Sequence, residues 1–120
     1  MSVQSQLLAK EETLWSGGAP EYRLTLDGDC LVAFTEMAGV QSRDKIAQMA
    51  GEGGRWQDVD IEVEGFLQPT TDVSILTYRI SAVNGKAGAP YSARVSSGYV
   101  KRDGEWRMMF HQQTPLATDS

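Results

Sequence analysis

The stretch from Tyr91 to Pro115, YSARVSSGYVKRDGEWRMMFHQQTP, constrains the fold of this chain more than any other part of the sequence. Two runs of strand-forming residues flank the pair Asp103-Gly104, and Asp-Gly is a strong turn signal because both residues accept a positive φ. The stretch is therefore predicted to form one long β-hairpin. Its second strand carries the only histidine of the chain, His111.

The register of this hairpin decides which polar side chains reach the interior, and two registers fit the sequence. A two-residue loop pairs Trp106 with Lys101 and puts Arg94 on the same face as His111. A three-residue loop with a bulge pairs Trp106 with Val100 instead and points Arg94 into the interior. Both loop types are common, so the sequence leaves the register open.

The N-terminal third of the chain has helical periodicity. Apolar residues recur at spacings of three, four and seven and so fall on one helical face; they are Val3, Leu7, Leu8, Leu14 and Trp15. The glycines after Ser16 end this helix, because glycine readily takes the left-handed conformation of a helix C-terminus. A short second helix is predicted over residues 20–26 and a strand over residues 30–34. A third helix is predicted from Arg43 to Ala50, with Ser42 as its N-cap, and with Ile46, Met49 and Ala50 facing inward.

From Trp56 onward the periodicity changes to two, which indicates strands. Three apolar residues, Val59, Ile61 and Val63, alternate with the acids Asp58, Asp60, Glu62 and Glu64. A longer strand follows from Val73 to Val83, and Asn84-Gly85 is a second hairpin signal before a strand that begins near Pro90. Helices followed by a run of antiparallel strands predict an α+β fold in which a curved sheet wraps the amphipathic helices.

Length and composition restrict the remaining possibilities. The 120 residues fit a single domain spanning residues 1–120. A net charge of −5 disfavours nucleic-acid binding, and no apolar run approaches the length of a membrane helix. Without a leader pattern, a cytoplasmic protein is the expectation. The single cysteine, Cys30, has no disulfide partner and no companions for a zinc site.

The chain resembles the nuclear transport factor 2-like superfamily in three features. They are the order of its elements, the Gly104-Glu105-Trp106 motif that closes the last hairpin, and the terminal run Phe110–Pro115. Within this superfamily, the chain is most similar to the domain of unknown function family 4440, beside the SnoaL-like and ketosteroid-isomerase-like groups. The resemblance covers roughly residues 7–115. It implies a cone-shaped, cystatin-like fold in which helices close a bent sheet around an apolar pocket. It also implies a homodimer formed through the outer face of the sheet.

Two residues are candidates for catalysis. His111 is one, because histidine changes its protonation near neutral pH and serves as a general base. The sequence shows no partner for it, so a hydrogen-bonded core or interface histidine is the favoured interpretation. Asp58 is the other, because it lies at the start of its strand, where the mouth of a cone could place it. The other acids of the alternating stripe are expected to be solvated. No metal site and no cofactor are predicted.

Five residues are candidates for ligand binding. Trp15, Tyr22, Trp56 and Tyr78 offer flat apolar surface with a polar tip and could line a pocket, although packing in the core explains them equally well. Arg94, if it faced inward, would be a buried cation that needs a carboxylate from the protein or the ligand. An exposed or interface arginine is the alternative.

The sequence does not carry over a known activity of the superfamily. Ketosteroid isomerases of this fold use a tyrosine on the first helix as part of an oxyanion hole, and the first helix here has none. The favoured hypothesis is a homodimeric domain that binds a small, partly apolar molecule. The alternative is an isomerase, cyclase or hydratase in which His111 or Asp58 moves a proton. A third possibility is a structural module whose interior is filled by its own side chains.

Overall fold

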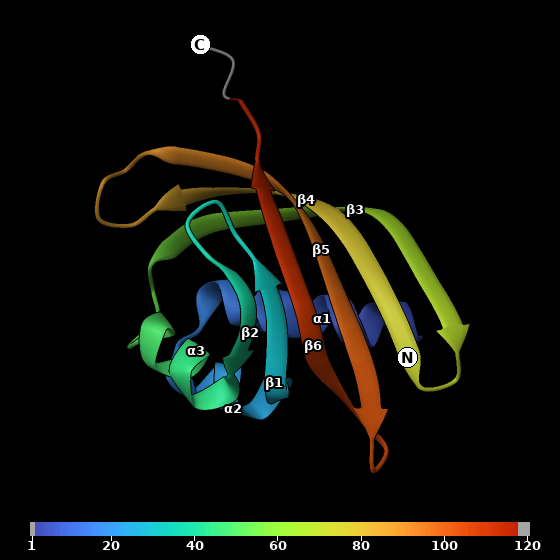
Figure 1. The fold of residues 1–120 in the computed structure, drawn as a ribbon. Coiled ribbons are helices and arrows are strands. Elements are labelled where there is room, and N and C mark those ends of the chain that lie inside the picture. Colours follow the sequence, from blue (N-terminus) through green and yellow to red (C-terminus); the bar gives the residue numbers. More distant parts are fainter. Residues whose placement is uncertain (1, 118–120) are drawn as a thin grey trace.

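The computed structural model describes residues 2–117, in which three helices pack into the hollow of a strongly bent sheet (Figure 1). The helices are α1 (Val3–Ser16), α2 (Ala19–Thr25) and α3 (Arg43–Ala50). The strands are β1 (Leu26–Ala33), β2 (Ala38–Ser42), β3 (Trp56–Thr70), β4 (Val73–Asn84), β5 (Pro90–Arg102) and β6 (Glu105–Pro115). The predicted α+β architecture, with a sheet wrapped around N-terminal helices, is confirmed.

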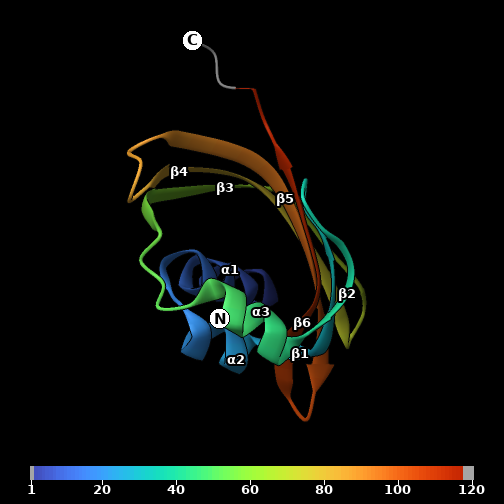
Figure 2. The ribbon, with the colours of Figure 1, turned by 60° about the vertical axis from the view of Figure 1, so that its left-hand side comes forward.

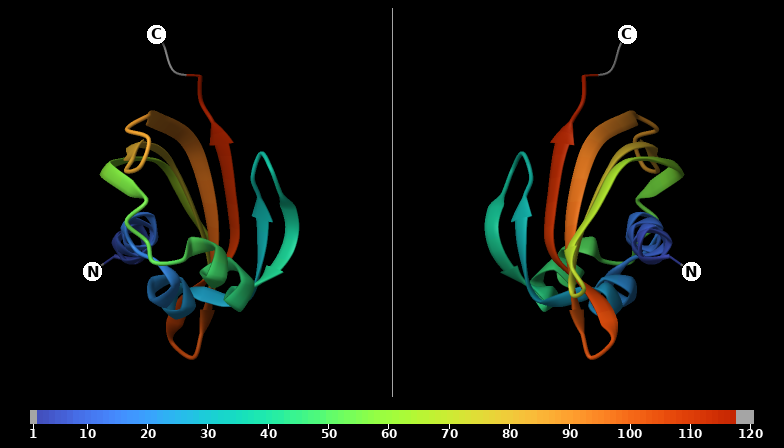
Figure 3. Two further views of the ribbon diagram at one scale, coloured as in Figure 1. Left: turned by 90° about the vertical axis from the view of Figure 1, so that its left-hand side faces the viewer. Right: turned by 90° about the vertical axis from the view of Figure 1, so that its right-hand side faces the viewer.

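The sheet has the strand order β2-β1-β6-β5-β4-β3. Neighbouring strands are antiparallel except for β1 and β6, which pair in parallel and place Val32 opposite His111. The sheet is thus mixed, where the sequence predicted an antiparallel one. Figure 2 shows how far β3, β4 and β5 bend over α1, and the side views of Figure 3 show all the helices on the concave side.

The buried face of α1 positions the core. Ser2 caps the helix by accepting a hydrogen bond from the Ser5 amide at 3.1 Å. Leu7, Leu14 and Trp15 are buried, as their spacing predicted, and they pack on apolar side chains of the sheet. These core side chains include Leu26, Val32, Leu76, Tyr78, Ile80, Val95, Tyr99, Trp106 and Met108.

The last hairpin has the two-residue loop, because Trp106 pairs with Lys101 and both loop residues have positive φ. The register then shifts: Tyr99 pairs with Met108, whereas Gly98 pairs with Phe110. Met109 is therefore the extra residue of a β-bulge. Because side chains alternate with period two, the bulge reverses the faces of the β6 residues that follow Met109. The alternation of β5 is unchanged.

This reversal decides the outcome of the register question. His111 pairs with Ser97 on the concave face, and Arg94 pairs with Thr114 on the outer face. The prediction that a two-residue loop puts Arg94 on the face of His111 is wrong, because neither alternative included a bulge inside the strand.

Three further differences concern β1, β2 and α3. The first strand begins at Leu26 rather than Cys30. The sequence did not predict β2, because Gly39 indicated a break between elements and the strand is short and lies exposed at the edge of the sheet. In α3 the fully buried residue is Ala47, whereas Met49 is 54% exposed, so the predicted inward face is rotated.

Two glycine pairs allow the helices to approach each other. A Cβ added to Gly18 would lie 2.6 Å from the carbonyl oxygen of Gly51. A Cβ added to Gly53 would lie 2.6 Å from the carbonyl oxygen of Gly17. The Ala19 amide donates to the Gly51 carbonyl at 2.8 Å across this contact. The glycines that end α1 and α3 therefore also hold α2 and α3 together.

Candidate functional site

A cavity of about 630 Å³ lies between the helices and the concave face of the sheet. Side chains from all three helices, from β1 and β6, and from the starts of β3 and β5 line it. Its apolar lining comes largely from Leu14, Leu26, Val32, Phe34, Ile46 and Met108. A volume of this size is typical of sites for small organic molecules.

Three aromatic rings form one wall of this cavity. The ring centroids of Trp15 and Trp56 are 5.7 Å apart in an edge-to-face arrangement, and those of Trp56 and Tyr91 are 4.9 Å apart. Trp15 and Tyr91 complete the cluster at 6.4 Å. Because each ring touches the other two, the cluster is a continuous surface, which we call the aromatic wall.

A buried carboxylate is among the groups that line the cavity. Glu11 on α1 is 1% exposed, and its side chain accepts three hydroxyl hydrogen bonds. Oε1 accepts from Tyr78 at 2.6 Å and from Ser97 at 2.9 Å, and Oε2 accepts from Tyr99. A buried carboxylate requires such partners, because it has lost the water that would otherwise solvate it.

The two tyrosines remain protonated donors to this carboxylate. Burial raises the pKa of Tyr78, and the negative charge and hydrogen bond of Glu11 raise it further. The same causes, in the same order, raise the pKa of Tyr99 well above its usual value. The Trp15 indole donates to the Tyr78 hydroxyl at 2.7 Å, so the cluster also holds one ring of the aromatic wall.

His111 connects this cluster to the cavity. Its Nδ1 lies 2.9 Å from Ser97 Oγ, and its Nε2 lies 2.8 Å from the Gln113 Oε1. The Gln113 amide in turn donates to the Tyr91 hydroxyl at 3.0 Å. A continuous chain of hydrogen bonds therefore runs from Glu11 through Ser97 and His111 to the aromatic wall.

Counting protons along this chain restricts the state of the histidine. Ser97 has one hydroxyl proton and gives it to Glu11, so it can only accept from Nδ1–H of His111. The Gln113 oxygen at Nε2 also requires a proton, and His111 is then an imidazolium. A neutral His111 fits if the Gln113 amide is reversed and donates to Nε2. The two hydrogen-bonding arrangements of His111 thus differ in the orientation of the Gln113 amide.

Ser97 does not act as a nucleophile in this array. It is fully buried, and its hydroxyl lies between Glu11 and His111 rather than at the cavity surface. The order of groups is carboxylate, hydroxyl, imidazole, so the imidazole is the group that faces the cavity. The arrangement is suited to proton transfer or hydrogen bonding by His111, not to acyl transfer.

Cys30 also lines the cavity but is chemically quiet. Burial, and secondarily the charges of Glu11 and Asp27, raise the pKa of its thiol to about 12. The thiolate, which is the reactive form, is scarce at neutral pH. Cys30 therefore serves as a small apolar side chain of the lining, as the sequence indicated.

Three of the predicted ligand-binding residues, Trp15, Tyr22 and Trp56, line the cavity, and so does the candidate base His111. Tyr78 lies behind the lining as a partner of Glu11.

Two candidates lie elsewhere. Arg94 is on the outer face, where its Nε and Nη2 donate to the two carboxylate oxygens of Glu64 at 2.8 and 3.3 Å. Asp58 is exposed at a positive-φ bulge near the start of β3 and does not line the cavity. The alternative in which Arg94 points into the cavity is therefore wrong, because the two-residue loop puts Arg94 on the outer face. The bulge at Asp58 turns that carboxylate to solvent.

Sequence reasoning missed Glu11, the centre of the polar cluster. The signal for it was present, because Glu11 follows Leu7 by four residues and precedes Trp15 by four, which places a carboxylate inside the apolar face of α1. Its hydroxyl partners could not be identified, because they lie 67 to 88 residues further along the chain.

Neither a metal site nor a membrane helix is found within residues 2–117. No three His, Cys, Asp or Glu side chains of this part come close enough together to hold a metal ion. None of its helices combines the length and the apolar character needed to cross a bilayer.

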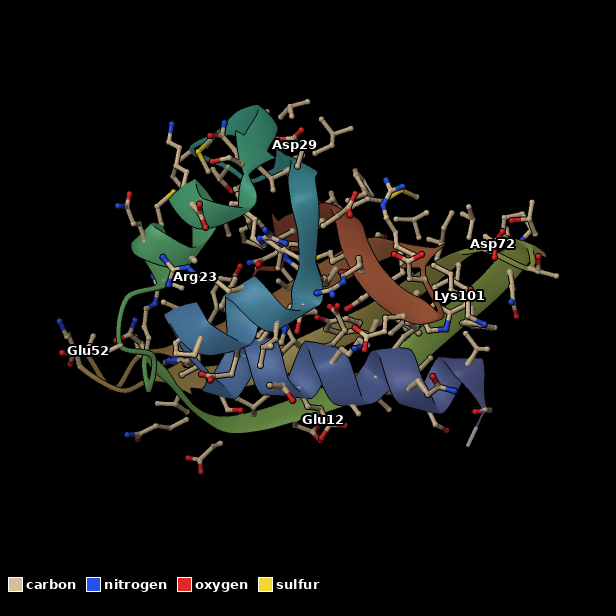
Figure 4. The ribbon with its side chains drawn as sticks, turned by 90° about the horizontal axis from the view of Figure 1, so that it is seen from below. Glu12, Arg23, Asp29, Glu52, Asp72 and Lys101 are labelled. Atoms are coloured by element: carbon tan, nitrogen blue, oxygen red, sulfur yellow. The ribbon has the colours of Figure 1, made fainter. Side chains whose placement is uncertain are left out.

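Replacement of Glu11 by alanine should destabilise the fold strongly. It leaves three buried hydroxyl groups without their acceptor, at about 1–3 kcal/mol each, so a loss of at least about 3 kcal/mol is expected. The matched control is Glu12→Ala, at the exposed neighbouring position labelled in Figure 4, which should change stability by less than about 0.5 kcal/mol. Urea denaturation measures both. Equal midpoints for the two variants would show that the hydroxyls do not depend on Glu11.

Comparison with known proteins rests on structure alone. No protein-family model matches the chain, and no curated protein matches it significantly in sequence. The more specific resemblance to the SnoaL-like family 4440 therefore stays a prediction, as does the cytoplasmic location.

Among solved structures, a ketosteroid isomerase-like protein from Erwinia carotovora atroseptica superposes with a TM-score of 0.76 at 15% identity, covering 97% of this chain and 95% of that one. A nuclear transport factor 2-like protein of unknown function from Prochlorococcus gives 0.77 at 14% identity, with 99% and 97% covered. The association domain of C. elegans CaMKII gives 0.70 at 11% identity, with 92% and 90% covered. From its helices, its bent sheet and these superpositions, the chain has the nuclear transport factor 2-like fold.

Proposed function

We propose that this protein binds a small, largely apolar molecule in the cavity between the helices and the sheet. The observation that carries the proposal is the cavity of about 630 Å³ with its aromatic wall. Native interiors are packed closely, and voids larger than a water molecule are few. A structural module with a filled interior would not need this space.

The polar groups of the cavity support the same proposal. Apolar surface covers most of the lining, and a small number of polar side chains stand at defined places, as in known ligand sites. His111, Gln113 and Tyr91 are fixed by hydrogen bonds to each other. Fixed polar groups orient a ligand without paying a large ordering cost on binding.

Filling the cavity should abolish binding. Val32→Phe adds a ring to a side chain of β1 that is 2% exposed and lines the cavity. The measurement is a thermal-shift screen with small planar apolar compounds, in which wild type should be stabilised by ligand and this variant should not.

The control is Leu24→Phe, which also introduces a ring, at a position on α2 that is 72% exposed and outside the cavity. It should retain the shift. The proposal fails if no compound stabilises the wild type, or if a ligand stabilises a folded Val32→Phe variant equally.

A second candidate function is proton-transfer catalysis of the isomerase, cyclase or hydratase kind. It is favoured by one observation, the chain from Glu11 through Ser97 to His111, which ends at the cavity. His111 would move the proton, and Ser97 and Glu11 would fix its orientation and balance its charge. Asp58 has no part in this candidate, because it is exposed outside the cavity.

The catalytic candidate predicts exchange of carbon-bound protons next to a carbonyl group. Incorporation of deuterium from D2O into a panel of cyclic ketones, followed by NMR, should be accelerated by wild type. His111→Ala should lower the rate by about 10²–10⁴-fold, whereas Arg94→Ala on the outer face should not change it. Exchange that persists in His111→Ala would exclude His111 as the base.

We also propose that two copies associate through the outer face of the sheet. An apolar row crosses all six strands on that face, and each member pairs with the next across the strands. Its members are Val40, Leu31, Phe110, Gly98, Ile75 and Leu67. Val40, Leu31, Ile75 and Leu67 are exposed, whereas Phe110 is half-buried and Gly98 is buried. Exposed apolar side chains that gather on one face mark interaction sites. One structural neighbour is itself described as an association domain.

A charge within this row should separate the copies. Ile75 on β4, which is 39% exposed, is changed to Asp, and the molar mass is measured by light scattering after gel filtration. Wild type should have twice the mass of the chain and Ile75→Asp the mass of one chain. Leu24→Asp, on α2 and 72% exposed, is the control and should stay dimeric. A monomeric wild type at high protein concentration would refute the dimer.

A further inference from the structure

The polar groups around the cavity differ in whether they already have partners. The oxygens of Glu11 are taken by three hydroxyls, and His111 and Gln113 are bonded within their own chain. By contrast, the side chains of Tyr22 and Arg55 line the cavity and make no hydrogen bond or ion pair within residues 2–117. The hydrogen-bond donors of Tyr22 and Arg55 are therefore available to a ligand.

Tyr22 and Arg55 lie close enough to influence each other. Burial raises the pKa of Tyr22, the positive charge of Arg55 partly opposes this, and the negative charge of Glu11 adds a smaller increase. Tyr22 thus remains a protonated phenol, with one O–H to donate beside the guanidinium of Arg55. A guanidinium and a neutral hydroxyl together match an anionic oxygen, because charge-assisted hydrogen bonds are the strong ones.

The aromatic wall is suited to a ring rather than to an ammonium group. A cation held between rings needs space on each ring face, with its centre within about 6 Å of each centroid. Here the ring centroids are only 4.9 to 6.4 Å apart, so the rings contact one another and form one surface rather than a cage with space for a cation between them. One carboxylate that lines the cavity, Glu36, also has no partner within residues 2–117; like Arg55 it is exposed, and it lies on the loop between β1 and β2.

We propose that the ligand of this cavity is an aromatic or planar apolar carboxylate, whose ring lies on the aromatic wall and whose carboxylate is bound by Arg55 and Tyr22. This inference rests on the proposed binding function and names its ligand class. Arg55 directly precedes Trp56 in the chain, so the cationic group and the wall belong to the same entry into β3. His111, which also lines the cavity, is left for a second functional group of the ligand.

The test compares three probes that share a naphthalene ring and differ in the charge of their substituent: 2-naphthoate, 2-naphthamide and 2-naphthylmethylammonium. Isothermal titration calorimetry gives the affinity of each for wild type. The carboxylate should bind about tenfold tighter than the amide, and the ammonium more weakly than the amide. Arg55→Gln should remove the preference for carboxylate over amide without changing the amide affinity, and Tyr22→Phe should reduce it severalfold.

Two variants serve as controls. Arg23→Gln removes a cation from α2 that pairs with Asp44 at 3.5 Å and does not line the cavity (Figure 4), so the carboxylate preference should be kept. Glu36→Gln removes the opposing charge and should not weaken carboxylate binding.

The outcomes separate this inference from the function on which it rests. Equal affinity for carboxylate and amide, with Val32→Phe blocking both, would overturn the ligand class and leave the binding function standing. Tightest binding of the ammonium, lost in Glu36→Gln, would overturn it in favour of a cationic ligand. If none of the three probes binds, the ligand class is overturned, and a failed thermal-shift screen would then overturn the binding function too.

Discussion

The carboxylate of Glu11 is the group on which the arrangement of the interior depends. It is contributed by α1, and its hydroxyl partners stand on β4 and β5, so the same three hydrogen bonds that satisfy the charge fix the helix against the middle of the sheet. Rotation of α1 about its axis would carry the carboxylate away from its donors. A buried ionic cluster of this kind is weak evidence for stability, since apolar replacements of similar volume often fold as well. The cluster has a second effect, because the hydrogen bonds of Glu11 hold Ser97, and through it His111, in place.

The bulge at Met109 is the second constraint, and it acts on the same site. With regular alternation from the Asp103-Gly104 turn, His111 would stand on the outer face of β6. One extra residue in β6 returns it to the concave face opposite Ser97, whereas Arg94 on the regular strand β5 stays on the outer face, where it pairs with Glu64. Bulges are known to redirect side chains next to functional sites. The single residue inserted here supplies the histidine of the cavity and, at the same time, leaves Phe110 for the outer apolar row.

What the sequence could predict was local, and what it could not predict depended on distant partners. The turn at Asp103-Gly104, the N-cap of α3 at Ser42 and the alternation after Trp56 are all written in neighbouring residues, and each is found in the structure. The same reasoning placed Trp15, Tyr22 and Trp56 at the cavity, because large aromatics on amphipathic elements face the interior. The bulge, the parallel pairing of β1 with β6 and the partners of Glu11 depend on contacts between segments far apart in sequence. No pattern within one segment contains them, so the faces of Arg94 and His111 could not be assigned.

The charges of the cavity divide into two groups with different consequences. His111 and Glu11 are joined through the Ser97 hydroxyl, so the carboxylate and the imidazole belong to one chain of hydrogen bonds. Arg55 lines the same cavity but takes no part in this chain. The cavity therefore presents two kinds of polar group to the proposed ligand: a guanidinium and a phenol at Arg55 and Tyr22, and an imidazole held by its hydrogen-bond partners at His111. Because the two sets share no hydrogen bond, a substitution in one is expected to leave the other in place.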